Sequence, residues 1–329
     1  MASGLRALRR RILTPNVSET SMETRGFHVK NPTSKELLET IGRTFLTGYG
    51  YAVEARSSAD AEEYLEKIPV QFRGFAYEGA AMGASMLDAL PGGSGRRFPG
   101  LLAGRGAQHV YMAYIGAGWA MARLPKFRWS KIQAPDPLLR WLVLDGYGFH
   151  QAYFRTEKYV HGHFTDPSFG WPADGPRWYA NRVIDQGIGR AMWFVGGTDP
   201  ELVTSMIDKF PQARRADLYS GAALAASYAG GVDETELREF KKAAADYRSE
   251  VAQGCAFAAT ARVHAGLVVP HTELATQVIC GITPEHAAKV CENALPAQVL
   301  AGPPESGELP AYEVWRQRIA AELMSLGTS

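Results

Sequence analysis

The chain has 329 residues, 46% of them hydrophobic and 21% charged, which is the composition of a folded protein and excludes wholesale disorder. A formal net charge of +1 supplies no overall field for a polyanion, so we expect no nucleic-acid partner. The sequence contains no run of about 18 apolar residues that would span a bilayer. Three cysteines without close spacing fit a reducing compartment, and we expect a cytoplasmic protein.

Residues 1–32 are predicted to form an N-terminal basic helix and a loop. Within residues 4–13, Leu5, Leu8 and Ile12 share one helical face while arginines occupy the others. Such a helix would make peripheral contact with an anionic membrane surface or dock on a partner. The alternative interpretation is a frayed, solvated terminus.

Residues 33–300 are predicted to form one α-helical repeat domain. Thr33 or Ser34 would cap the first helix, and a second helix would begin after Ser57 and stop before Pro69, which makes one helical hairpin. Residues 184–231 then contain two similar copies of a unit with a glycine, about ten small and apolar residues, and a Gly-Gly stop. A repeat of this length indicates stacked hairpins that bury their apolar faces against one another.

One glycine marks the same place in each unit, and we call these seven residues the register glycines. They recur at separations of 30 to 41 residues, and an arginine often stands six residues earlier, as in Arg73 and Arg215. Glycine costs about 1 kcal/mol relative to alanine inside a helix, so its recurrence predicts close approach between helices. The register glycines are Gly48, Gly79, Gly116, Gly146, Gly187, Gly221 and Gly254.

The more polar second helices have clear start signals at Asp199, Asp233 and Thr283. We therefore predict an all-α fold, an α-α helical-hairpin repeat array similar to a tetratricopeptide (TPR) solenoid, with about seven units and long inserted loops. The small-residue helices would form the inner layer and the capped helices the outer one.

Two segments interrupt the rhythm, at about residues 87–108 and 155–178. The first is rich in Gly, Pro and Arg and is interpreted as a long connection, while the second is dense in aromatic residues and histidine. Residues 301–329 are expected to form a linker and a C-terminal helix. The 155–178 segment is the preferred place for a functional site, since long ordered loops are usually functional.

Histidines near that segment are the first candidates for chemistry. His161 and His163 flank Gly162, and both could reach one metal ion with His150 or Asp166. Acid–base use and a structural role are the other interpretations. Because no second spaced pair of ligands appears, we assign no metal.

Polar side chains precede several register glycines and should form a ladder along one side of the array. They would either pair with the arginines that precede the register glycines or line a ligand site. These residues are Glu78, Asp145, Gln186, Ser220 and Gln253.

Aromatic residues around the insertion would suit core packing or an apolar groove for a flat or polyunsaturated ligand. The predicted ligand-binding residues are Tyr147, Phe149, Tyr153, Phe154, Trp171 and Trp178. The predicted catalytic residues are His150, His161, His163, Asp145 and Arg155. The Gly-x-Gly pairs are half of a dinucleotide fingerprint, but no strand precedes them and they recur four times, so we expect no cofactor.

Four blocks, at residues 25–30, 72–83, 142–153 and 185–191, resemble the actinobacterial UnbL-like family. The resemblance covers about residues 5–300. That family carries only the label "enediyne biosynthesis protein" or domain of unknown function, and it brings no established catalytic residues. It implies a place in enediyne polyketide antibiotic clusters, beside an iterative polyketide synthase, an UnbV-like protein and a membrane UnbU-like protein.

The resemblance and the predicted fold together give two functional expectations. The first is an accessory or scaffold protein of enediyne core biosynthesis that holds a partner protein or a polyene-derived intermediate on the inner face of the array. The second is a cofactor-independent isomerase or cyclase that acts on the polyene-derived precursor. The sequence leaves open whether the protein is an enzyme.

Overall fold

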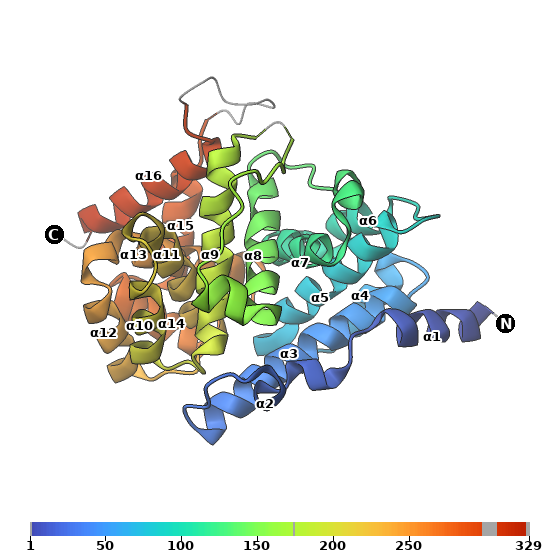
Figure 1. Ribbon diagram of the computed structural model, residues 1–329, viewed down its shortest axis with the longest axis horizontal. Coiled ribbons are helices and arrows are strands. Elements are labelled where there is room, and N and C mark those ends of the chain that lie inside the picture. The colour runs from blue at the N-terminus through green and yellow to red at the C-terminus, as the bar shows by residue number, and fades with distance from the viewer. Residues whose placement is uncertain (1, 174, 298–307, 327–329) are drawn as a thin grey trace.

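The computed structural model describes residues 2–173, 175–297 and 308–326, which contain sixteen α-helices, several short 3-10 or π turns and no β-strand (Figure 1). The all-α prediction is confirmed for this part of the chain. The α-helices are α1 (Ala2–Leu13), α2 (Met22–Arg25), α3 (Pro32–Glu54), α4 (Ser58–Leu65), α5 (Val70–Ala89), α6 (Arg97–Ala103), α7 (Val110–Arg123), α8 (Leu142–Phe154), α9 (Arg177–Val195), α10 (Pro200–Asp208), α11 (Gln212–Ala229), α12 (Glu234–Ala243), α13 (Arg248–His264), α14 (Pro270–Ile279), α15 (Pro284–Asn293) and α16 (Ala311–Leu326). The short turns are η1 (Val17–Thr20), η2 (Arg105–His109), η3 (Lys126–Lys131), η4 (Leu139–Trp141), η5 (Glu157–His161) and η6 (Ala245–Tyr247).

Seven helices, which we call the inner helices, pack each against the next in chain order: α3, α5, α7, α8, α9, α11 and α13. Each carries one register glycine. A Cβ atom at Gly79 would lie 1.9 Å from the carbonyl oxygen of Phe45, and one at Gly187 would lie 1.9 Å from that of Asp145. The backbones therefore touch, as the recurring glycines predict.

The backbone contacts between successive inner helices follow the same pattern at most register glycines. For five register glycines the facing oxygen belongs to the residue directly before the register glycine of the preceding inner helix. Gly116, for example, faces the carbonyl oxygen of Glu78, and Gly187 faces that of Asp145. The polar residues that precede the glycines are thus buried at the helix crossings, and they do form a buried series.

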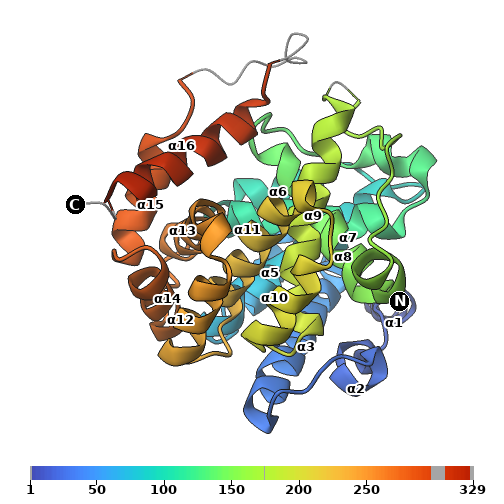
Figure 2. The ribbon, with the colours of Figure 1, turned by 60° about the vertical axis from the view of Figure 1, so that its left-hand side comes forward.

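The outer helices α10, α12 and α14 lie side by side (Figure 2). Their start signals act as expected: the Asp199 side chain accepts from the Leu202 N–H at 3.1 Å, and Asp233 makes a capping box with Glu236. At α3 the expectation was wrong, because Asn31 is the cap and Pro32 is the first helical residue. Neither Thr33 nor Ser34 caps that helix.

Two helical hairpins, α4–α5 and α10–α11, are held by the same kind of side-chain contacts. In each, an arginine and a tyrosine four residues later both approach a carboxylate seven residues before the arginine. The tyrosine hydroxyl donates to that carboxylate at 2.6 Å in one hairpin and 3.0 Å in the other. These arginines therefore tie a hairpin together and do not pair with the polar ladder. The sets are Arg73, Tyr77 and Glu66 in one hairpin and Arg215, Tyr219 and Asp208 in the other.

The segment 87–108 is more than the long connection expected from its Gly and Pro content. It contains α6 and η2, and the Asp88 carboxylate accepts from the backbone N–H groups of Arg97 and Phe98, both at 2.9 Å. Phe98 and Leu101 of α6 are buried. The segment 155–178 contains only the π turn η5 between the end of α8 and the start of α9. Residue 174 lies outside the described residues.

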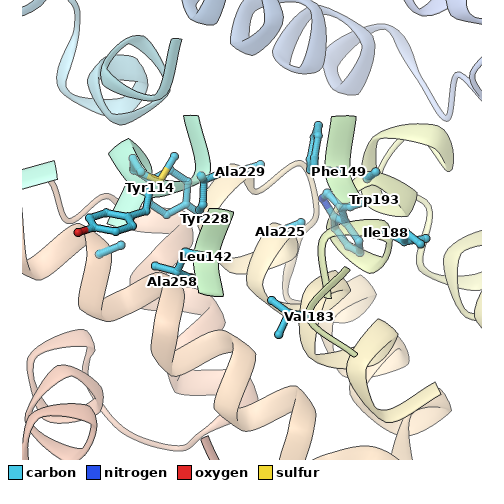
Figure 3. Close-up of a cluster of buried hydrophobic side chains, with 14 of the residues drawn as sticks. Tyr114, Leu142, Phe149, Val183, Ile188, Trp193, Ala225, Tyr228, Ala229 and Ala258 are labelled. Carbon is cyan, nitrogen blue, oxygen red and sulfur yellow. The ribbon is translucent and has the colours of Figure 1, made fainter. Parts of the chain in front are cut away.

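The row of inner helices curls, so that α11 and α13 contact α5. The rings of Phe75 in α5 and Tyr228 in α11 meet edge to face with centroids 5.1 Å apart, and Arg262 in α13 donates to the carbonyl oxygen of Gln71 at 3.1 Å. Buried hydrophobic side chains of α7, α8, α9, α11 and α13 pack together in a cluster (Figure 3). The curl leaves a cavity among the inner helices.

The termini add two further contacts. In α1, Arg9 donates to the carbonyl oxygen of Val53 at 2.6 Å, while Leu8 and Ile12 are exposed. At the other end, α16 packs on α13 and α15. Most of the expected linker, residues 301–307, lies outside the described residues. No helix in the described part of the chain is long and apolar enough to cross a membrane.

Candidate functional site

A central cavity lies among six inner helices: α3, α5, α7, α8, α9 and α11. It holds about 800 Å³ of space free of atoms, the part open to solvent included, yet only about 60 Å³ admits the centre of a water-sized sphere. Little of the empty volume lies far enough from the wall atoms to hold the centre of a water molecule, so the walls of the cavity stand close together. The cavity therefore fits a slender molecule better than a bulky one.

Eight of the described residues that line the cavity are aromatic. Phe149, Ala225 and Tyr228 belong both to the buried cluster of Figure 3 and to the wall of the cavity. Rings offer flat, polarisable faces to a ligand. The aromatic wall residues are Phe45, Phe75, Trp119, Phe149, Tyr153, Phe154, Phe194 and Tyr228.

The sequence position relative to the register glycines explains which residues line the cavity. The residue three places after the register glycine lines the cavity in five successive inner helices. On a helix this position lies next to the glycine on the same side, so the close crossings aim one side chain per helix into the same space. These residues are Met82, Trp119, Phe149, Arg190 and Leu224.

The cavity is partly open to solvent, and one of the residues that line it is an exposed cation. Arg123 is exposed and, within the described part of the chain, has neither a hydrogen bond nor an ion pair. His150 and Phe154 beside it are half-buried, and Arg25 stacks on the Phe154 ring at 4.9 Å. We call the part of the wall that contains Arg123, His150 and Phe154 the rim. An anionic group of a ligand would find its counter-ion here.

A buried carboxyl group, Glu78, lines the cavity and is only 3% exposed. The Trp119 indole N–H donates to Glu78 Oε1 at 3.0 Å, and Arg190 Nη2 lies 4.0 Å from the same oxygen. Burial raises the pKa of Glu78 to about 7, although the Arg190 charge acts in the opposite direction. Glu78 therefore exchanges a proton near neutral pH.

Arg190 serves two carboxyl groups. Its Nη1 hydrogen-bonds Asp145, which is fully enclosed behind it, and burial raises the pKa of Asp145 against the opposing charge of Arg190. Its Nε–H is buried and has no acceptor among the described residues. The cavity thus combines a proton-exchanging carboxyl group with a cation that retains one free donor.

Several of the predicted site residues meet at this cavity. Phe149, Tyr153 and Phe154 form part of its wall, and Asp145 stands behind Arg190. His150 lies at the rim with its ring edge to face with Trp119 at 5.5 Å. Burial and the charge of Arg123 lower the pKa of His150 to about 3, so the imidazole is neutral at ordinary pH.

The other histidines do not join it. His161 is exposed with Glu157 at 4.0 Å, and His163 packs on the Phe210 ring at 4.1 Å. Neither lines the cavity that contains His150. The described residues contain no group of three or more His, Cys, Asp or Glu that could hold a metal ion. The possible ligand set of His161, His163 and His150 or Asp166 is therefore not assembled.

The remaining predicted residues also lie elsewhere. Arg155 is exposed at the end of α8, and Trp178 is 53% exposed. Tyr147 packs on Trp129 and its hydroxyl accepts from Gln151, while Trp171 is partly buried against the core. Of the six predicted ligand-binding residues, Phe149, Tyr153 and Phe154 line the central cavity, and Tyr147 lines a smaller pocket beside the insertion.

Residues 4–323 match a family model described as "Protein of unknown function (DUF1702)", and the chain belongs to that family. No curated protein and no solved structure matches the chain.

Proposed function

We propose that this member of the DUF1702 family holds a slender, unsaturated apolar molecule in the central cavity. The observation that supports the proposal most is the run of five cavity-lining residues at the same place of successive repeats, which makes the cavity a product of the repeat. In this proposal the helices form a curled TPR-like array whose inner face is the binding surface.

The chemistry of the cavity favours a polyene-like chain. A narrow space between aromatic faces suits an extended conjugated chain, since stacking adds to the burial of apolar surface. The unpaired Arg123 at the rim suits a carboxylate at one end of that chain. The resemblance to enediyne biosynthesis proteins adds the substrate class, a polyene-derived intermediate of enediyne core biosynthesis.

The role in that pathway is either accessory or catalytic. As an accessory protein the chain would receive the molecule from the polyketide synthase or pass it to UnbV-like and UnbU-like partners. The exposed Leu8 and Ile12 of α1, among arginines, would suit a membrane surface beside an UnbU-like protein. Glu78 favours the second candidate, a cofactor-independent isomerase or cyclase, because a carboxyl group that exchanges protons near neutral pH suits acid–base chemistry.

Binding of a fluorescent conjugated tetraene, parinaric acid, tests the proposal. We expect saturable binding to the wild-type protein, and we expect Arg123→Gln to weaken it by roughly tenfold because a charge-assisted contact contributes about 1.5 kcal/mol or more. The methyl ester of parinaric acid lacks the charge and should bind both proteins equally.

A matched control replaces Arg105, which is exposed and lies outside the cavity, by Gln. That variant should bind parinaric acid like the wild type. If neither the acid nor its ester binds saturably to the wild type, the proposed function is wrong.

A further inference from the structure

Glu78 occupies an unusual electrostatic position. Its carboxyl group lies in the cavity wall, and the nearest cation, Arg190, is bonded to another carboxyl group, Asp145. The Trp119 N–H holds Oε1 in place. A carboxyl group fixed by one donor and only partly paired is suited to gain and lose a proton without moving.

The groups that face Glu78 come from four neighbouring helices. Arg190 of α9 lies beside Glu78 in the cavity wall, Asp145 of α8 lies behind Arg190, and Tyr228 of α11 belongs to the same wall. Arg123 of α7 and His150 of α8 stand at the rim, with Glu19 of η1 near them. The lining residues from α3 carry no titratable group.

We propose that Glu78 is a catalytic acid–base residue that moves a proton between two carbon atoms of a bound unsaturated carbonyl compound, while the Arg190 N–H holds the carbonyl oxygen. The inference rests on the proposed function, since it requires that an apolar chain enters the cavity. It names the reaction class of the site, a shift of a carbon–carbon double bond.

The step balances without a co-reactant. The Glu78 carboxylate removes a proton from the carbon between a C=C and a C=O group, and the C–H electron pair forms an enolate. The carboxylic acid then returns the proton to the far carbon of the former double bond, and the new double bond stands in conjugation with the carbonyl group. Nothing is oxidised or reduced, and Glu78 ends ionised as it began.

Arg190 supplies what the enolate needs. Its buried Nε–H has no acceptor among the described residues, and the side chain lines the same cavity as Glu78. A fixed donor in a space with little water stabilises charge that develops on oxygen. A pKa of about 7 for Glu78 suits a group that must take up the proton and then release it.

The N-acetylcysteamine thioester of 3-decenoic acid is a suitable probe, since it combines a slender chain with a C=C bond one carbon removed from the carbonyl group. Wild-type protein should convert it to the 2-decenoyl thioester, with deuterium from D₂O appearing at the far carbon. The rate should rise with pH through about 7 as Glu78 ionises. Glu78→Gln should lower the rate by at least about 100-fold, the usual contribution of a general acid–base group.

Displacement of parinaric acid by the thioester separates binding from chemistry. Glu78→Gln should bind the thioester as the wild type does, which a misfolded variant would not. Glu62→Gln is the matched control, because Glu62 is a buried glutamate outside the cavity that accepts from the Gly106 N–H at 3.1 Å. Binding without conversion by the wild type, or full activity of Glu78→Gln, would overturn the inference alone. Failure of the wild type to bind parinaric acid would overturn the proposed function.

Discussion

The buried carboxyl group of Glu78 makes the free energy of unfolding depend on pH. Burial holds its pKa at about 7, above its ordinary value of 4.5. Between these two values the folded state binds more protons than the unfolded state. Its contribution to the free energy of unfolding is therefore most favourable below pH 4.5 and is lost as the pH rises through 7.

Glu78→Gln should remove this loss, because glutamine keeps the shape of the protonated acid. The free energy of unfolding of the variant relative to the wild type should rise by about 3 kcal/mol between pH 4 and pH 8, from a shift of roughly 2.5 pKa units at 1.36 kcal/mol each. Urea unfolding at the two pH values measures it. Asp185, whose pKa burial raises to about 6, is present in both proteins and cancels. A difference that does not depend on pH would contradict the prediction.

At single residues the sequence predicted part of the site. His150 and Phe149 were identified because they lie close to the aromatic and histidine-rich insertion, and both line the cavity. Trp119 and Arg190 were missed because they are far from the insertion in sequence. Their shared position three places after a register glycine was the signal that would have found them.

At the scale of the helix, backbone contact at the crossings is the dominant constraint. A Cβ at Gly79 would meet the Phe45 carbonyl oxygen at 1.9 Å and the Tyr49 nitrogen at 3.0 Å. Both atoms are backbone, so no side-chain rotation relieves the clash. The two helices would have to move apart along their whole contact.

Gly79→Ala should therefore destabilise the protein by about 3 kcal/mol or more, at the upper end of the cost of overpacking a core. Gly4→Ala is the matched control, since Gly4 lies in α1 with nothing within 4 Å of an added Cβ. Alanine there should be neutral or stabilising by up to about 1 kcal/mol. Chemical unfolding of both variants compares them, and equal effects would show that the crossings are not close.

Elements with local signals were predictable, and those that depend on distant partners were not. The caps at Asp199 and Asp233 act within a single helical turn, so the sequence alone indicates where α10 and α12 begin. The first two backbone N–H groups of the short helix α6 donate to Asp88, which lies at the end of another helix. Because the surrounding residues are rich in Gly and Pro, no local sequence pattern predicts this helix.

At the scale of the whole molecule, the curl of the row of inner helices could not be predicted from the sequence. The register glycines bring each inner helix against the next, but the return of α11 and α13 to α5 depends on small rotations that accumulate over several helices. Tyr228 and Phe75 meet only because of that return. The cavity exists only because the inner helices curl, and the curl cannot be predicted from the sequence. The sequence alone therefore favoured the insertion as the site.

The C-terminal helix α16 is joined to the inner helices by buried charged groups. Arg316 Nη1 donates to Asp217 and to Glu313, each at 2.8 Å, and the Glu313 carboxylate also accepts from the Tyr179 hydroxyl at 2.8 Å. Asp217 is 1% exposed and Glu313 is 3% exposed. Arg182, which is partly exposed, is the other cation that contacts these carboxylates.

Arg316→Ala should destabilise the protein by about 3 to 5 kcal/mol, because it leaves two buried carboxylates with one partly exposed counter-ion. The control is Arg238→Ala, which breaks an exposed pair with Glu234 and should cost about 0.5 kcal/mol or less. Thermal unfolding measures both. No residue of α16 lines the central cavity, so Arg316→Ala protein kept below its unfolding temperature should bind parinaric acid like the wild type. Loss of that binding in the folded variant would mean that α16 sets the shape of the curl itself.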